Sequence, residues 1–331
     1  MRKEGGVRHI LAADIGGTNS RFGHFQDDDQ DGLALLQTCW LATNSVRSFG
    51  ELLRQLPADG FSLTADQADA MVIAVAGPLE HGMSAAPPYI PWDIDLAAPD
   101  LRKMAPNAKL INDFVAQAYA CVSPVGCTAV QILSGEPEID GVIGVLGGGT
   151  ALGKALLVPG AEAEFQAWPS EGGHALFPFC TEQEMRFHEF YRERGGFSEI
   201  TGNLVISGRG MRFVHWFLTG DDLEPPEVAA RLTMESETLA WLARFHGRAC
   251  RGFALEILAR GGLFIAGGVA GRNPQILGHE QFRAEFLHSA TMGHVLENIP
   301  VHLLDDQDSG LWGAAFHGWQ ILEGKTSHNR A

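Results

Sequence analysis

The amino-acid sequence predicts an α/β protein made of two halves of similar fold, with mixed sheets flanked by helices. Its 331 residues are enough for two domains of ordinary size. Short apolar runs typical of buried strands alternate with segments of helical spacing along the chain. A glycine-rich hairpin with the tip Gly16-Gly17-Thr18 recurs in the middle of the chain as Gly148-Gly149-Thr150. Two such hairpins, each opening a long α/β segment, indicate two halves that face each other.

The first half is expected to begin with the hairpin and to continue through alternating elements. A buried strand at 7–14 leads into the turn at 15–19, and a returning strand follows at 20–25. The further expected elements are a helix at 47–57, a buried strand at 70–76, a proline-rich loop at 86–91, a strand ending at 109–111 and a helix at 114–122.

The second half is expected to repeat the hairpin at 142–158 and then to become rich in helix. Its last helix, 309–322, has Ser309 as the expected N-cap. The other expected elements are helices at 182–194 and 234–258 and strands at 262–266 and 300–304.

The charge balance argues against a nucleic-acid partner. Acidic residues outnumber basic ones by 40 to 24, for a formal net charge of −16, whereas binding to a phosphate backbone needs a basic face. A polyanionic substrate must then be met by backbone amides, a metal ion or a few placed cations.

Cysteine usage and hydropathy favour a cytoplasmic protein without a membrane partner. No two cysteines have the C-x-x-C spacing of a zinc or redox site, which predicts reduced thiols. No run of about 18 apolar residues is present, and the first residues lack a signal-peptide pattern. The cysteines are Cys39, Cys121, Cys127, Cys180 and Cys250.

The two glycine-rich turns have the composition of phosphate-binding loops. Glycine lets the backbone approach a phosphate closely, so that successive N–H groups can form an anion nest. The neighbouring threonine adds a hydroxyl donor. The alternative is an ordinary β-turn, which is the better interpretation of a single copy. Neither copy is a G-x-x-x-x-G-K-[ST] loop or a G-x-G-x-x-G motif that opens a helix.

Asp14 ends the first strand beside the first of these turns. A carboxylate next to bound phosphate is repelled unless a cation lies between them. Magnesium prefers oxygen ligands and retains waters, so Asp14 could hold it through water. The alternative is that Asp14 caps the turn.

Asn112 and Asp113 lie between an expected strand and an expected helix. A carboxylate at a strand end is well placed to accept the proton of a sugar hydroxyl, which is typically worth about 10²–10⁴ in rate. An asparagine can both donate to and accept from hydroxyls. The alternative is a helix cap.

Two further turns are candidate ligand sites. Glu171-Gly172-Gly173-His174 could bring a carboxylate and an imidazole together to bind hydroxyls, the alternative being an exposed loop. The strand at 264–266 enters Gly267-Gly268, which could support a nucleobase or ribose, the alternative being a plain turn.

Together these motifs resemble those of the bacterial glucokinase family, within the superfamily of hexokinase, actin and the heat-shock chaperones. Their order and spacing agree along nearly the whole chain. The matching segments are LAADIGGTNSRFGHF (first phosphate motif), INDFVAQAYA (sugar-binding and catalytic segment), GGGTALG (second phosphate motif), EGGHALFPF (glucose-binding turn) and FIAGGVAGR (adenosine motif).

The resemblance implies roles for individual residues. Asp113 is the implied catalytic base, and Asp14 the implied site of magnesium held through water. The implied glucose ligands are Asn112, Asp113, Glu171, His174 and Asn203. The implied nucleotide-binding residues are Ala13, Asp14, Ile15, Gly16, Gly17, Thr18, Asn19, Gly147, Gly148, Gly149, Thr150, Gly267 and Gly268.

The sequence departs from the family pattern in three places. Asn203 stands where the family has a glucose-binding glutamate, and Ala151 stands where a glycine is usual. Residues 87–92 (PPYIPW) replace a loop containing Thr-Asn. The cysteine-rich zinc motif of related sugar kinases and repressors is absent after His174.

The implied activity is transfer of the γ-phosphoryl group of Mg·ATP to the 6-hydroxyl of a hexose, most readily glucose. The alternatives are a sugar sensor or scaffold with weak turnover, and an ATPase of the same superfamily acting on another acceptor. The implied fold is the two-lobed, actin-like (ribonuclease H-like) fold with a ligand cleft between lobes. Its implied small domain is 1–111 plus 305–331, its large domain is 112–304, and family members are commonly homodimers.

Overall fold

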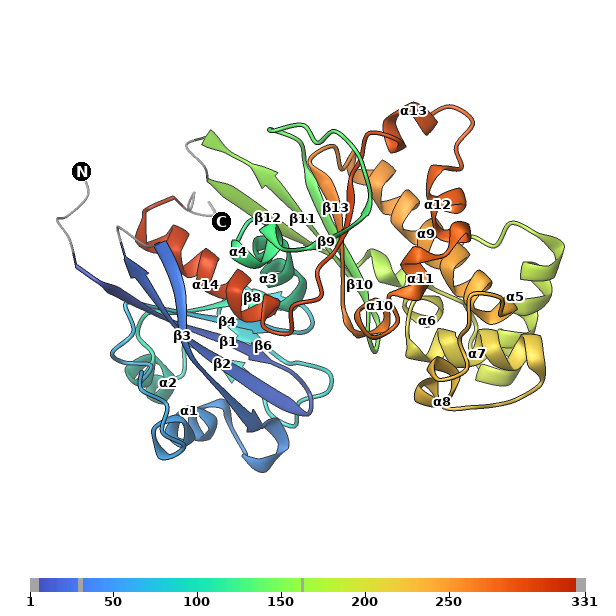
Figure 1. The fold of residues 1–331 in the computed structure, drawn as a ribbon. Helices are drawn as coiled ribbons and strands as arrows, with labels where there is room; N and C mark the ends of the chain where they lie inside the picture. Colours follow the sequence, from blue (N-terminus) through green and yellow to red (C-terminus); the bar gives the residue numbers. More distant parts are fainter. Residues whose placement is uncertain (1–5, 29–31, 162–163, 326–331) are drawn as a thin grey trace. The chain divides into compact units, whose positions relative to one another are not determined.

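The computed structural model describes residues 6–28, 32–161 and 164–325. By their contacts, the residues group into two compact units (Figure 1). The first unit is Met1–Thr128, Gly160–Ala167 and Asp306–Ala331, and the second is Ala129–Pro159 and Trp168–Asp305. None of the described helices is long and apolar enough to cross a membrane.

The first unit is built on a five-stranded mixed sheet with the order β3-β2-β1-β4-β8. β1 pairs antiparallel with β2 and parallel with β4, which in turn pairs parallel with β8. The strands are β1 (Arg8–Ile15), β2 (Asn19–Asp28), β3 (Gly32–Ala42), β4 (Ala70–Val75) and β8 (Ala108–Asn112), with a small sheet of β5 (Leu79–Glu80), β6 (Ser84–Ala85) and β7 (Ile94–Asp95) beside them.

Both faces of the first sheet are covered, which explains the continuous apolar run of its central strands. On one face, Leu11 and Ile15 of β1 join a core that includes Phe49 of α1. On the other face, α14 packs on β1 and β4, and Ile10 lies against Gly318. The helices of this unit are α1 (Phe49–Ala58), α2 (Pro99–Met104), α3 (Asp113–Ala120), α4 (Pro124–Cys127), α14 (Ser309–Leu322) and the 3-10 turn η1 (Thr43–Ser45).

The second sheet has the order β12-β11-β10-β13-β14-β9. If β10, β11, β12, β13 and β14 are counted as the first to fifth strands, their order across the sheet is third, second, first, fourth, fifth. The strands β1, β2, β3, β4 and β8 of the first sheet, counted in the same way, have the same order. This identity confirms the two halves of similar fold that the repeated hairpin predicts. The strands are β9 (Val130–Leu133), β10 (Ile143–Gly148), β11 (Leu152–Pro159), β12 (Phe165–Ser170), β13 (Gly262–Ala266) and β14 (Val301–Leu303).

Helices supply most of the second core, where Phe187, Trp241 and Phe245 are fully buried. A buried ion network also joins three helices of this unit. Arg248 Nη1 donates to Glu184 Oε2 at 2.7 Å and Arg248 Nε to Glu285 Oε1 at 2.9 Å. The elements are η3 (Gly172–His174), α5 (Glu182–Gly195), α6 (Gly202–Val205), α7 (Gly208–Thr219), α8 (Pro225–Ala229), α9 (Glu237–Ile257), α10 (Gly268–Arg272), α11 (Gln275–Gly278), α12 (Glu280–Leu287) and α13 (Gly293–Leu296).

The structure contains elements that the sequence analysis did not expect, among them β3, α7 and α12, and two expected helices begin differently. α14 covers Ser309–Leu322 as expected, but its N-cap is Asp308 and Ser309 is already helical. α9 begins at Glu237 rather than 234, because the Ser236 side chain accepts a hydrogen bond from the N–H of Leu239 and caps the helix there. The domain division at 111/112 and 304/305 remains a prediction; by contacts, α3 groups with the first unit, where it packs against α14.

Candidate active site

The C-terminal ends of three parallel strands meet at one edge of the first sheet. In the registers of β1, β4 and β8, Ile15 lies beside Val75, and Val75 lies beside Asn112. This edge is where open α/β sheets bind ligands. The fold therefore brings Asp14 and Asp113 to one edge, although they are far apart in the sequence.

The first glycine-rich turn is held on both sides. Gly16 N–H donates to Asn19 O at 3.1 Å, and Thr43 Oγ1 donates to Gly16 O at 2.7 Å. A Cβ on Gly17 would lie 3.0 Å from both the carbonyl oxygen and the Cβ of Tyr89, so the proline-rich loop covers this glycine. Ala13 and Ile15 are buried, whereas Thr18 and Asn19 are exposed at the tip of the turn.

Asp14 and Arg21 form an ion pair beside this turn. Arg21 Nη2 donates to Asp14 Oδ2 at 2.6 Å, and the Asp14 side chain is 15% exposed. Burial raises the pKa of Asp14, Arg21 opposes that shift, and the nearby Asp308 adds to it. Gly310 of α14 leaves the room that the carboxylate needs, because a Cβ there would lie 2.7 Å from Asp14 Oδ2.

This arrangement fits magnesium only through intervening water. The described residues contain no group of three His, Cys, Asp or Glu side chains that could cage a metal ion. Magnesium commonly keeps several waters and takes direct ligands from substrate phosphates, so a single oriented carboxylate is sufficient. Asp14 is such a carboxylate, and Arg21 fixes its orientation.

Asn112 and Asp113 form the junction between β8 and α3. Asn112 is the N-cap, and its Oδ1 accepts from the N–H groups of Phe114 and Val115 at 2.9 and 3.3 Å. Its Nδ2 donates to Gly77 O at 3.2 Å. The half-buried Asp113 is the first helical residue, where the helix dipole favours a carboxylate. The cap interpretation of Asn112 is thus confirmed, and its role as a sugar ligand remains a prediction.

The glycines of the second turn have different surroundings. A Cβ on Gly147 would lie 2.1 Å from Ala266 O, and one on Gly148 would lie 2.3 Å from Ile206 O. A Cβ on Gly149 would meet nothing within 4 Å. Packing alone therefore requires glycine at 147 and 148, and Gly149 is the position with room for a ligand.

The adenosine-like motif lies against this second turn. Gly267 has a φ of 86°, and a Cβ there would lie 2.8 Å from Gly148 O. β13 is the parallel neighbour of β10, so the two turns leave the same edge of the second sheet. The structure thus brings Gly267 and Gly268 together with Gly147–Thr150.

The Glu171–His174 turn is closely packed at Gly173, whereas the side chains of Glu171 and His174 are exposed. A Cβ on Gly173 would lie 2.1 Å from Leu152 O and 2.3 Å from Asn203 Oδ1. His174 Nε2 and Glu171 Oε2 are 3.7 Å apart, and these side chains are 73% and 65% exposed. Both polar side chains therefore lie close together and exposed on one tight turn, and their role as sugar ligands remains a prediction.

Asn203 has a structural task at this turn. Its Oδ1 accepts a hydrogen bond from Leu152 N–H at 2.9 Å, which ties α6 to the start of β11. Its position beside Gly173 agrees with the expected place near the glucose-binding turn. The amide NH₂ of Asn203 is the group that could donate to a ligand.

The sequence analysis did not identify Lys154 and Tyr89 as residues that lie beside the candidate ligand-binding turns. Lys154 on β11 is 8% exposed, lies 5.1 Å above the Phe253 ring, and its Nζ would be 3.4 Å from a Cβ on Gly172. A lysine inside an apolar strand is a signal that could have found it. Nothing local in the sequence shows that Tyr89 covers Gly17.

Comparisons with known proteins agree with this geometry. A sequence model of the glucokinase family matches residues 11–320. The glucokinase of Caulobacter vibrioides is 31% identical, with 92% of this chain and 93% of that protein covered. The crystal structure of a glucokinase from an Antarctic psychrotroph superposes with a TM-score of 0.80 at 26% identity, covering 94% and 99% of the two chains.

A more distant structure shares the fold alone. It is a ROK family glucokinase from Streptomyces griseus in complex with glucose and AMPPNP, with a TM-score of 0.56 at 16% identity, covering 94% of this chain and 99% of that one. These neighbours have the two-lobed, actin-like fold that the sequence predicts. With the family model spanning nearly the whole chain and the matching turns in place, the protein belongs to the glucokinase family.

Proposed function

We propose that the protein transfers the γ-phosphoryl group of ATP to the 6-hydroxyl of glucose, with Asp113 as the general base. The observation that carries this proposal is the position of Asp113 at the C-terminal end of β8, on the same sheet edge as the glycine-rich turn that follows β1. Family membership supports the reaction class, and the complex of the Streptomyces griseus neighbour supports ATP as donor.

In this proposal, the carboxylate of Asp113 accepts the proton of the sugar hydroxyl while the oxygen attacks the γ-phosphorus in line. Asn112 fixes the start of α3 through its cap and so orients Asp113. The exposed Glu171 and His174 would bind further sugar hydroxyls, and Asn203 would donate through its amide.

The phosphates would be held mainly by backbone amides. Thr18 and Asn19 are exposed at the tip of the first turn, and Gly149 and Thr150 form the open part of the second. Gly267 and Gly268 would support the nucleoside. When bound, magnesium would neutralise phosphate charge, and Asp14 would hold it through water.

Replacing Asp113 by Asn tests the central role. Asp113→Asn keeps the size of the side chain and removes its basicity, so we expect kcat to fall by about 10²–10⁴ with little change in the dissociation constant for glucose. Asp100→Asn, an exposed aspartate at the start of α2, is the matched control and should leave kcat unchanged. A variant at 113 that retains more than half of kcat would remove Asp113 from this role.

The same coupled assay separates the alternatives. Tight glucose binding by calorimetry without ATP consumption would favour a sugar sensor, and ATP consumption that ignores every added hexose would favour an ATPase with another acceptor. We further propose a cytoplasmic homodimer, which light scattering of the purified protein and fractionation of its host cells would test.

A further inference from the structure

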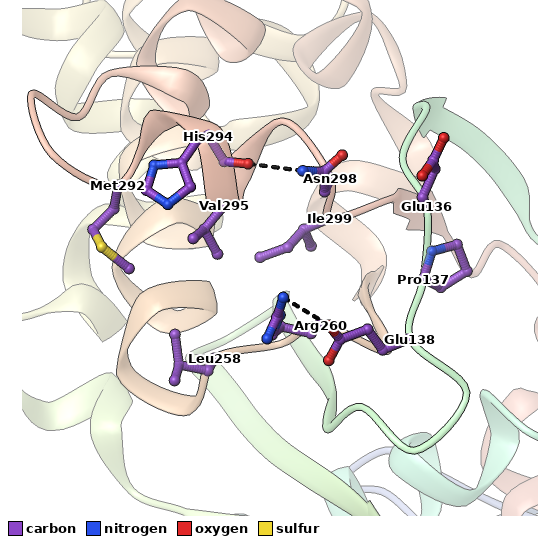
Figure 2. A pocket seen from close by; sticks show the side chains of 10 residues that line it. All are labelled: Glu136, Pro137, Glu138, Leu258, Arg260, Met292, His294, Val295, Asn298 and Ile299. Atoms are coloured by element: carbon purple, nitrogen blue, oxygen red, sulfur yellow. Dashed lines mark hydrogen bonds and ion pairs between the residues drawn. The ribbon is translucent and has the colours of Figure 1, made fainter.

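A pocket of about 710 Å³ in the second unit is a second candidate ligand site. Ligand pockets commonly measure about 300–1,000 Å³. Three segments form its walls: the loop before β10, the end of α9, and α13 with the residues that follow it (Figure 2). The lining residues are Glu136, Pro137, Glu138, Leu258, Arg260, Met292, His294, Val295, Asn298 and Ile299.

This pocket is remote from the glycine-rich turns of the same unit. β10 and β13 run parallel, and the registers place Ile143 beside Gly262 at one end and Gly147 beside Ala266 at the other. β14 runs parallel to β13 as well. The pocket residues precede the N-terminal ends of β10, β13 and β14, and the glycine-rich turns follow the C-terminal ends of β10 and β13. A ligand in the pocket therefore does not occupy the proposed nucleotide site.

The pocket is preformed by backbone contacts. Glu136 N–H donates to Asn298 O at 2.9 Å, and Glu138 N–H donates to Arg260 O at 2.8 Å. A Cβ on Gly141 would lie 2.4 Å from Gly261 N, so the loop is closely seated where it enters β10. Because these bonds fix the walls in advance, a ligand would not have to order them.

Leu258 is the unusual residue of the pocket. It is the C-cap of α9 with φ 48° and ψ 62°, a left-handed conformation that helices usually assign to glycine or asparagine. It is one of two non-glycine residues with positive φ in the described part of the chain. Its side chain is 48% exposed and lines the pocket. A strained backbone that presents a leucine to solvent indicates a use for that side chain.

The charges around the pocket favour a cation. Arg260 Nη2 pairs with Glu138 Oε1 at 2.6 Å, so these two charges balance each other and the charge of Glu136 leaves the lining net negative. Glu136 adds a second carboxylate, and the C-terminus of the 21-residue helix α9 carries partial negative charge. His294 is the remaining titratable group, exposed on α13.

Apolar side chains supply the other part of the pocket. Val295 and Ile299 line it across from the ion pair of Glu138 and Arg260, Leu258 lies beside Arg260, and Met292 extends the apolar surface (Figure 2). A carboxylate can accept from two donors at once, so Glu138 can bind an ammonium group while it retains Arg260.

We propose that this pocket binds a small organic cation with an aliphatic body, an alkylammonium compound. The ammonium group pairs with Glu138 at the side where Glu136 adds negative charge. The alkyl chain lies on Leu258, Val295 and Ile299. Binding of an alkylammonium compound to this pocket can be measured without the phosphoryl-transfer reaction.

Ligand-observed NMR titration of the full chain with three probes tests the charge preference. n-Hexylammonium, n-hexanol and hexanoate share one alkyl chain and differ in charge. In 0.5 M salt, which screens the net negative charge of the protein, we expect hexylammonium to bind about fivefold more tightly than hexanol and hexanoate to bind weakest. Hexanoate binding as tightly as hexylammonium would overturn the proposal, as would competition of hexylammonium with ATP.

Two substitutions place the probe in this pocket. Leu258→Gly relieves the left-handed strain and removes the alkyl contact, so hexylammonium should bind at least about threefold more weakly while the thermal midpoint is unchanged or higher. Glu138→Gln should abolish the preference for hexylammonium over hexanol, and Glu193→Gln on the exposed face of α5 is the control.

If Leu258→Gly fails to fold, Val295→Thr tests the apolar contact instead, because threonine keeps the shape of valine. Weaker binding of hexylammonium to this variant would place the alkyl chain in the pocket. Unchanged affinity in both Val295→Thr and Glu138→Gln would show that the probe binds elsewhere and would overturn the assignment.

Discussion

Nη2 of Arg21 donates a hydrogen bond to Oδ2 of Asp14 at a distance of 2.6 Å. The two residues are direct neighbours in the register of β1 and β2, and Trp40 is the neighbour of Arg21 on β3. The guanidinium carbon lies 5.1 Å from the centre of the Trp40 ring. Three adjacent strands therefore hold one carboxylate in a single orientation beside the first glycine-rich turn.

The first prediction concerns the pH dependence of this pair. Burial raises the pKa of Asp14, and Arg21 acts in the opposite direction. Arg21→Met removes that opposition, so the pKa of Asp14 rises further and the acidic limb of kcat/KM for MgATP moves to higher pH. We also expect kcat/KM at neutral pH to fall about 10- to 100-fold.

A pH–rate profile from pH 5 to 9 measures both effects. Arg186→Met, which breaks the exposed pair with Glu182, is the control. A rate loss with an unmoved acidic limb would mean that Arg21 acts on the substrate and not through Asp14.

The second prediction separates two neighbouring glycines. Gly148→Ala forces a Cβ against Ile206 O and should cost about 1–3 kcal/mol of unfolding free energy. Gly149→Ala has open space and should change stability by less than about 0.5 kcal/mol. It should nevertheless raise KM for MgATP, because its methyl group would occupy the proposed place of a phosphate. Thermal unfolding and steady-state kinetics test the pair. Unchanged KM in Gly149→Ala would exclude this residue from phosphate binding.

The third prediction concerns Asn203, which joins α6 to β11 beside the proposed glucose-binding turn. Asn203→Ala leaves Leu152 N–H without its acceptor, so we expect a loss of about 1–3 kcal/mol of stability together with a higher KM for glucose. Asn203→Asp keeps the acceptor and its size and restores the negative charge that the family has here, so glucose affinity should hold or increase. Glucose titrations and melting curves of the two variants provide the measurement; equal KM values in both would contradict a contact with sugar.

The fourth prediction concerns acid stability. His246 is 4% exposed in α9, and burial lowers its pKa to about 4. The unfolded chain, with a histidine pKa of about 6.5, takes up the proton first as the pH falls. Stability from the neutral imidazole is therefore complete above pH 6.5 and is lost toward pH 4, with about 2 kcal/mol gone by pH 5.

Urea unfolding of His246→Leu at pH 7 and pH 5 measures this effect. The variant should lose about 2 kcal/mol less than the parent between the two pH values. His81→Asn, at an exposed turn residue with positive φ, should leave the difference unchanged. An equal pH dependence in His246→Leu would contradict a buried neutral imidazole.

The sequence by itself determined part of the elements and the place of the glycine-rich turns. The hairpins, the strands at 70–76 and 262–266 and the last helix follow from apolar periodicity and from glycine, which act within a few residues. The repeated hairpin also predicted two halves of similar fold, and the two sheets share one strand order. Composition gave the net charge of −16, from which the expectation of no nucleic-acid partner follows.

Only the tertiary structure decided what each polar group and glycine does. Gly147 and Gly149 look alike in the sequence, but one meets Ala266 O and the other meets open space. Asn203 uses its oxygen on Leu152, and Leu258 strains its backbone at a pocket. The physical reason is range: periodicity records which face of an element is apolar, whereas close backbone approach and hydrogen-bond partners depend on segments that only folding brings together.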